Sequence, residues 1–222
     1  MENSYLLSLQ NIPYHFILID NNTHVHSIIQ KKCSDFNIHN ITTLQCNIQD
    51  FKDNFDIGIS IHACGLATDF AQFQCIQNHA LFICCSCCVG KIQTQQQSIY
   101  SISTPRSKWL NNIIQSDEYF QLCQYADHNA TTTTHSTDFI IEQQKRYCKS
   151  VLEWDRCMYA LESGIYDVVF MTRVIPYTED PNHSSSASKT LFNSPKNDVI
   201  VGVPKHWDDS TKKAIKQAFA IP

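Results

Sequence analysis

The hydrophobic pattern of the chain alternates between short apolar runs and segments with helical spacing. Apolar runs typical of buried strands occupy residues 14–20, 41–47, 56–62 and 80–87. Between them, residues 24–37 and 68–78 place apolar side chains three and four positions apart, which predicts amphipathic helices. Strands that alternate with helices indicate parallel β-α-β units, so we predict an α/β fold.

The second half of the chain contains longer elements. A long helix is expected from about Asp138 to Ser163, with Gly164 placed to end it. Within it, we interpret Asp155 and Arg156 as a solvated pair or as an anchor between helix and sheet, rather than as catalytic residues.

Two further strands and two insertions complete the pattern. Residues 166–175 and 197–204 are expected to form an antiparallel hairpin with a long tip, and a C-terminal helix follows over 208–220. Polar segments near 129–137 and 180–192 predict flexible insertions. No internal repeat is visible, and we predict a single domain over 1–222.

Composition narrows the class of protein. With 222 residues and 43% hydrophobic residues, the chain can bury a core. A net charge of −4 gives no strong signal for nucleic-acid binding. The eleven cysteines are irregularly spaced, which favours a reducing compartment over a disulfide scaffold. Because no secretory signal or membrane-length apolar run is present, we predict a cytoplasmic protein without a membrane partner.

Reactive side chains gather where two predicted strands end. The turn HACG, from His62 to Gly65, follows the strand at 56–62. Ligands of open α/β sheets bind at such carboxyl ends. His62 could orient a substrate or act as a general base, and Gly65 permits close approach of a ligand. Asp69 begins the next helix, where it could accept a proton or simply favour the helix dipole.

The cysteines at the end of the next strand allow three interpretations. Cys84, Cys85, Cys87 and Cys88 could bind zinc, form a redox pair such as Cys84 with Cys87, or line a pocket as small apolar side chains. Because four cysteines on one strand end cannot all face one ion, we favour pocket lining and predict no metal.

Four segments occur in a characteristic order: IHACGLATD, CCSCC before VGK, EWDRC and SPKNDVIVGVP. In this combination, from about Ser4 to Pro204, the sequence resembles the methyltransferase-like domains of the glutathione S-transferase C-terminal domain-containing protein family. The resemblance implies a Rossmann-like class I methyltransferase fold with S-adenosylmethionine as cofactor. More distant kinship with tRNA ribose methyltransferases suggests RNA as the methyl acceptor, and the substrate stays open between RNA and protein.

The resemblance also implies roles for individual residues. At the cofactor's adenosine, Asp20 would bind the ribose, and Asn47, Ile48 and Asp50 the adenine. His62, Ala63, Cys64 and Gly65 would lie beside the methyl group, with His62 or Asp69 giving acid–base help. Cys87, Cys88 and Asn197 would line the substrate pocket. Turn formation is the alternative for Asp20, Asn47, Asp50 and Asn197.

One departure from the family pattern concerns the cofactor cradle. In that fold the first strand ends in an acidic residue and a glycine-rich turn, whereas the first 60 residues here contain only Gly58. Without that strand, the strands at 14–20 and 56–62 would lack a shared hydrogen-bonding partner. We therefore predict an N-terminally incomplete methyltransferase domain. The alternatives are a non-catalytic protein-binding module and, on the cysteines alone, a small redox or metal protein.

Overall fold

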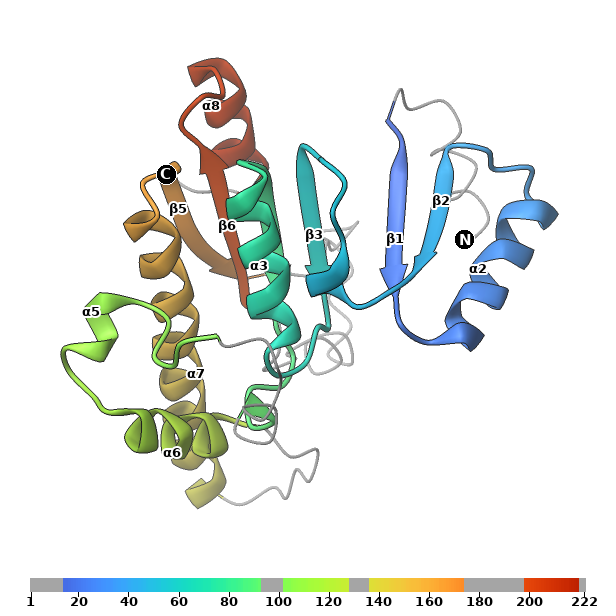
Figure 1. Cartoon of the computed structure of the whole chain (residues 1–222). Helices are drawn as coiled ribbons and strands as arrows, with labels where there is room; N and C mark the ends of the chain where they lie inside the picture. The colour runs from blue at the N-terminus through green and yellow to red at the C-terminus, as the bar shows by residue number, and fades with distance from the viewer. Residues whose placement is uncertain (1–13, 93–101, 128–135, 174–197, 220–222) are drawn as a thin grey trace, which may run out of the picture. The chain divides into compact units, whose positions relative to one another are not determined.

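The computed structural model describes residues 14–92, 102–127, 136–173 and 198–219 (Figure 1). The chain divides into two compact units, Met1–Asp53 and Asn54–Pro222. Both contain strands and helices, so the predicted α/β class is confirmed. The extent of the domain, 1–222, stays a prediction.

The first unit is built around one parallel strand pair. Strand β1 (Phe16–Asp20) pairs with β2 (Ile41–Gln45), and helix α2 (Thr23–Asp35) connects them. Asn22 caps α2 by accepting a hydrogen bond from the His24 amide at 2.9 Å. A 3-10 turn, η1 (Ile48–Asp50), follows β2. The carboxyl ends of β1 and β2 therefore meet at one edge of this sheet.

The second unit contains a four-stranded sheet with the order β3-β4-β6-β5. Its strands are β3 (Ile57–Ile61), β4 (Leu81–Cys85), β5 (Tyr166–Arg173) and β6 (Asp198–Pro204). Strands β3 and β4 are parallel, whereas β6 runs antiparallel to both of its neighbours. The predicted antiparallel pairing of the last two strands is thus confirmed.

The described part of this unit contains five helices. They are α3 (Ala67–Gln77), α5 (Lys108–Asn111), α6 (Ser116–Ala126), α7 (Ser136–Glu162) and α8 (Asp209–Ala218). The long helix predicted from the sequence is α7, and Gly164 follows it with a left-handed φ of 75°, as expected for a residue that ends a helix. Helix α6 was not predicted. It begins with a capping box between Gln115 and Glu118.

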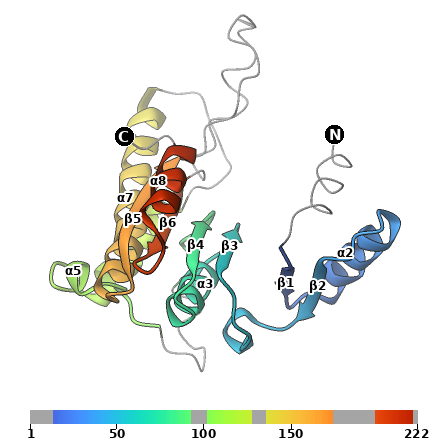
Figure 2. The same ribbon diagram turned by 90° about the horizontal axis from the view of Figure 1, so that it is seen from above.

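Helices cover both faces of the sheet (Figures 1 and 2). On one face, Phe82 and Ile200 pack with Cys157 of α7 and Cys75 of α3. On the other face, α8 packs against a separate apolar cluster; its members include Leu81, Val201, Val203, Ile215 and Phe219. Among the described strands, β3 has β4 as its only partner, so it forms an edge of this sheet.

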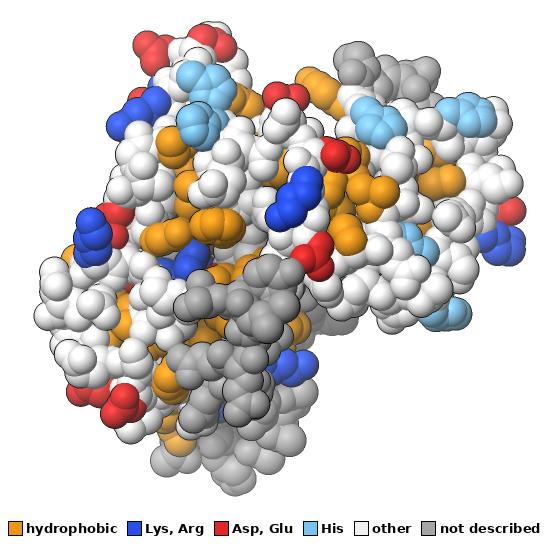
Figure 3. All heavy atoms as spheres, in the orientation of Figure 1, with side chains coloured by type: hydrophobic (Ala, Val, Ile, Leu, Met, Phe, Trp, Pro, Cys, Tyr) orange, Lys and Arg blue, Asp and Glu red, His pale blue; other side chains and the backbone are white. Residues whose placement is uncertain are grey.

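The edge strand β3 exposes apolar side chains. Ile59 and Ile61 are 63% and 66% exposed, although their partners Ile83 and Cys85 on β4 are half-buried. On the face drawn in Figure 3, the Lys and Arg side chains of the described residues lie at separate places, some of them beside Asp or Glu side chains. No helix within the described ranges is long and apolar enough to cross a bilayer.

Several predictions concern residues beyond those that the structure describes. Asn197 lies outside the described residues, as does the predicted insertion at 180–192. Helix α7 starts at Ser136, whereas the sequence predicted a start at about Asp138. Ser136 and Thr137, which the prediction assigned to the insertion at 129–137, therefore belong to the helix.

Candidate functional site

Two segments of the second unit form a joined pair of loops at the ends of β3 and β4. The His62 amide donates to the Cys85 carbonyl at 3.0 Å, and the Gly65 amide donates to the Cys88 carbonyl at 2.9 Å. His62 and Gly65 adopt left-handed φ values of 59° and 60°. Such a φ is uncommon for a residue other than glycine and costs of order 1–3 kcal/mol, so the elbow at His62 is held by its surroundings.

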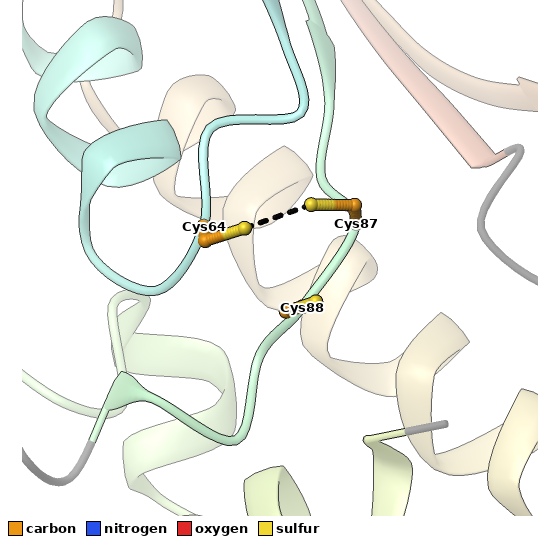
Figure 4. A group of neighbouring side chains, drawn as sticks. All are labelled: Cys64, Cys87 and Cys88. Atoms are coloured by element: carbon orange, nitrogen blue, oxygen red, sulfur yellow. Dashed lines mark hydrogen bonds between the residues drawn. The ribbon is translucent and has the colours of Figure 1, made fainter. Parts of the chain in front are cut away.

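Three thiols meet where these loops join (Figure 4). The Sγ atoms of Cys64, Cys87 and Cys88 all lie within 4.8 Å of one another. We call these three residues the thiol cluster. Cys64 and Cys87 share a hydrogen bond with their sulfurs 2.9 Å apart. Cys87 is buried, whereas Cys64 and Cys88 are half-buried. The cluster therefore has one inner thiol and two that reach toward solvent.

The cluster differs from the redox pair that the sequence suggested. The sequence suggested a pair of Cys84 with Cys87, but Cys84 lies within the apolar core beside Cys75. The thiol that Cys87 contacts is that of Cys64. Burial, followed by the hydrogen bond and charge of Cys64, raises the pKa of Cys87 to about 12. Cys87 is therefore a neutral thiol at physiological pH. All eleven cysteines are free thiols in this structure.

A buried ionic network lies behind the loops. The Arg156 guanidinium donates from Nε to Asp69 Oδ1 and from Nη2 to Asp69 Oδ2, each at 2.9 Å. Both side chains are at most 1% exposed. Asp69 lies in the first turn of α3, as expected. To accept a proton it would have to give up this bidentate pairing, so the arrangement favours a positioning role for Asp69.

The same arginine connects to the second loop through Glu153. Arg156 Nη1 lies 3.2 Å from both Glu153 carboxylate oxygens, and Glu153 also accepts a short hydrogen bond from the Ser86 hydroxyl. Ser86 immediately precedes Cys87. We call Asp69, Glu153, Arg156 and Ser86 the ionic network. Through it, helix α7 fixes both the start of α3 and the loop after β4, and so positions the thiol cluster.

Asp155 anchors a further segment to α7. Its carboxylate accepts hydrogen bonds from the amides of Arg106 and Ser107, at 2.8 and 2.9 Å, and from the Ser107 hydroxyl at 2.5 Å. Burial raises the pKa of Asp155, and these hydrogen bonds oppose the rise. Asp155 and Arg156 are both buried. The interpretation as a solvated pair is therefore wrong. Both residues do anchor α7, but to the segment before α5 and to helix α3 rather than to the sheet.

A cavity of about 560 Å³ lies elsewhere in this unit. It is lined by residues from the ends of α3 and α7, including His79 and Glu162, and by Arg106, whose guanidinium stacks 4.0 Å from the centre of the Tyr159 ring. None of the thiol cluster lines it. The strand-end site is thus separate from this cavity.

The first unit has its own polar group at the strand ends. Asp20 Oδ1 accepts from the Asn22 amide at 2.8 Å, the turn interaction that the sequence allowed. Asn47 accepts from the Asn21 side chain at 3.3 Å and donates to Asp50 Oδ2 at 2.8 Å. Ile48 is half-buried at the start of η1. Asp20 Oδ2 has no hydrogen-bond partner among the described residues.

Fold and site define an α/β protein whose polar and thiol side chains gather at the carboxyl ends of parallel strands. The chain is similar to the "Glutathione S-transferase C-terminal domain-containing protein homolog" of Drosophila melanogaster, with 34% identity over 181 residues and 80% of this chain. It is also similar to the "Glutathione S-transferase C-terminal domain-containing protein" of Bos taurus (31% over 188 residues) and of Homo sapiens (31% over 175 residues).

These names match the family that the sequence motifs indicated. The match covers 85% of this chain for the bovine protein and 79% for the human protein. The chain spans 30%, 26% and 24% of the length of the fly, bovine and human relatives. No family model matches the chain, and no solved structure matches it significantly.

Proposed function

We propose that this chain is an S-adenosylmethionine-dependent methyltransferase domain. The observation that carries the proposal is the left-handed elbow from His62 to Gly65, held against the loop after β4 by two backbone hydrogen bonds. Backbone strain of this kind clusters at binding and catalytic sites. Its place at the carboxyl end of a parallel strand is where α/β sheets bind their ligands.

The first unit fits the adenosine part of the cofactor. Asp20 keeps one carboxylate oxygen without a partner among the described residues, and it can accept hydrogen bonds from ribose hydroxyls there. The hydrogen bonds of Asn47 to Asn21 and Asp50 hold the end of β2 in place, and Ile48 offers an apolar surface for a base. The sequence offers no glycine-rich turn in its first 60 residues, so we assign no residue to the methionine part.

When bound, S-adenosylmethionine supplies an electrophilic methyl group. In the second unit, His62 is exposed at the elbow, where its imidazole can orient an acceptor or take its proton. Ala63, Cys64 and Gly65 would form the adjoining surface, with Cys87 and Cys88 on the acceptor side. Because Cys87 is a neutral thiol, it contributes apolar lining and does not compete as a nucleophile.

Backbone amide NMR can test this proposal on the chain as it exists. The chain would be titrated with adenosine, then with S-adenosylmethionine, at concentrations high enough to detect millimolar affinity. Adenosine should shift the amides of Asp20 and Asn47. S-adenosylmethionine should in addition shift those of Cys64 and Gly65. The change Asp20→Ala should weaken both titrations at least tenfold, because it removes the acceptor for the ribose hydroxyls.

The matched control is Asp35→Ala. Asp35 is an exposed acid of the same unit and pairs with Lys31 on the surface of α2. This change should leave both titrations unchanged. Shifts confined to the first unit would contradict the assignment of the methyl group to the β3 elbow. The absence of any shift would overturn the proposal and favour a non-catalytic binding module.

A further inference from the structure

The thiol cluster has the geometry of a metal site. We propose that Cys64, Cys87 and Cys88 bind a thiophilic metal ion of the Zn²⁺ type through their three sulfurs. The proposal is independent of methyltransferase activity. It rests on thiols that come from two separate chain segments, with Cys64 after β3 and Cys87 and Cys88 after β4. Cysteines of a single strand end could not all face one ion.

The spacing of the sulfurs suits a tetrahedral ion. With Zn–S bonds of about 2.3 Å, two thiolates of such a site lie about 3.8 Å apart. The three sulfurs already lie within 4.8 Å of one another, and the Cys64–Cys87 pair, at 2.9 Å, would open by about 1 Å as its shared proton leaves. Cys64, which is half-buried, is the residue of this pair that is less confined by its surroundings.

The ligands are held before any ion binds. Gly65 and Cys88 are joined by a backbone hydrogen bond of 2.9 Å, so the two loops cannot separate without breaking it. Ser86, next to Cys87, is fixed to Glu153, and Asp69 at the start of α3 is fixed to Arg156. A site whose ligands are held in this way loses little conformational entropy when it binds a metal.

The donor set selects the kind of ion. Within the described part of the chain, the cluster contains only cysteine sulfur, and no carboxylate or imidazole joins it. Thiolates favour Zn²⁺ and Cu⁺ over Mg²⁺ and Ca²⁺, which prefer oxygen. Three protein ligands leave the fourth position of a tetrahedral ion to water or a substrate, the arrangement of catalytic rather than structural zinc sites. The half-buried positions of Cys64 and Cys88 leave room for that ligand.

The experiment compares ligand variants with a matched cysteine variant. The whole chain, reduced and stripped with a chelator, would be titrated with Zn²⁺ against a chromophoric competitor and separately with Co²⁺. We expect one ion per chain, cobalt bands typical of tetrahedral thiolate coordination, and X-ray absorption that shows three sulfurs at about 2.3 Å. Added azide should change the cobalt spectrum if the fourth position is open.

Cys64→Ser and Cys88→Ser should each weaken Zn²⁺ binding at least tenfold. Cys85→Ser is the matched control, because Cys85 is also half-buried, ends the same strand and lies outside the cluster. It should bind Zn²⁺ as the unchanged chain does. Circular dichroism would establish that each variant is folded.

Two results would overturn the proposal. One is a Zn²⁺ ratio near zero for the folded, reduced chain. The other is an equal loss of affinity in Cys85→Ser and Cys64→Ser. A further outcome would identify a redox pair instead of a metal site. In that case the reduced chain would not bind Zn²⁺, and treatment with a peroxide would remove two thiols by joining Cys64 and Cys87 as a disulfide.

Discussion

The ionic network and the thiol cluster occupy adjacent positions in the second unit, yet they differ in kind. The network consists of full charges that are buried and paired with one another, as in the bidentate contact of Arg156 with Asp69. The cluster consists of three cysteine thiols, of which Cys87 is buried and the other two are half-buried. The charged residues have their interactions satisfied by the fold, whereas the thiols retain chemistry that a ligand could use. Reactive residue types therefore indicate function only together with their partners.

The largest effect is expected from breaking the network at its centre. Arg156→Met would leave Asp69 and Glu153 buried without their common cation, because Arg156 contacts both carboxylates. Removing one partner of a buried ion pair costs about 3–5 kcal/mol. Urea denaturation followed by circular dichroism would measure this loss.

Arg146→Met is the matched control for that prediction. Arg146 lies on the same helix but is half-buried and outside the network, so the free energy of unfolding should change by less than about 0.5 kcal/mol. The double variant Asp69→Leu/Arg156→Met should not recover this loss, because it leaves Glu153 without Arg156 and the buried Arg106 without Asp69, whose Oδ1 lies 3.4 Å from Arg106 Nε. Equal stability of Arg156→Met and Arg146→Met would show that the network contributes nothing.

The core thiols give an effect of similar size, and they sharpen the contrast with the cluster. Burial raises the pKa of both Cys75 and Cys123 from the ordinary value of 9.0 to about 12. The unfolded chain therefore loses these protons near pH 9, while the folded chain keeps them to about pH 12. Stability should fall as pH rises above 9, by about 1.4 kcal/mol per pH unit for each thiol, and level off above 12.

Urea denaturation between pH 8 and pH 11 would measure this slope. Cys123→Ala should lower the free energy of unfolding at pH 8, because it leaves a cavity in the core. Above pH 9, however, the free energy of unfolding of this variant should fall less steeply with pH, by the contribution of one thiol. An unchanged slope would mean that Cys123 ionises alike in the folded and unfolded chains.

Much of the fold could be predicted from local sequence pattern, because periodicity and end signals are local. The strand pairs and the long helix ended by Gly164 follow from such signals. Helix α6 was overlooked, although Gln115 and Glu118 form a capping box and its buried residues Tyr119, Cys123 and Ala126 have helical spacing. A search for capping boxes in the polar middle of the chain would have found it.

The site was predictable only in part. The prediction placed the turn after β3 correctly, but it ran β4 to residue 87, whereas the strand ends at Cys85. Which cysteines meet depends on the register of β3 against β4, where Ile61 lies opposite Cys85. The spacing of Cys84 and Cys87 suggested a pair, yet side-chain alternation along β4 turns Cys84 into the core. Asp69 pairs with Arg156 of α7, which is far away in the sequence, and no local sequence pattern indicates such a pairing. Long-range contacts decide these details, and one sequence does not specify them.

The smallest predicted effect is also the one that joins the two regions. Ser86→Ala removes the hydroxyl that links Glu153 to the loop carrying Cys87, while Glu153 keeps its contact with Arg156. We expect the free energy of unfolding to fall by about 1 kcal/mol, the usual contribution of one hydrogen bond. If the network positions the cluster, Zn²⁺ affinity should fall several-fold as well, because the Cys87 loop becomes less ordered. Ser60→Ala, on the neighbouring strand β3 and outside the network, is the control for both measurements. A loss of stability with unchanged Zn²⁺ affinity would show that the network supports the fold without positioning the thiols, since the hydrogen bond of Ser86 with Glu153 joins the network to the segment that carries Cys87 and Cys88.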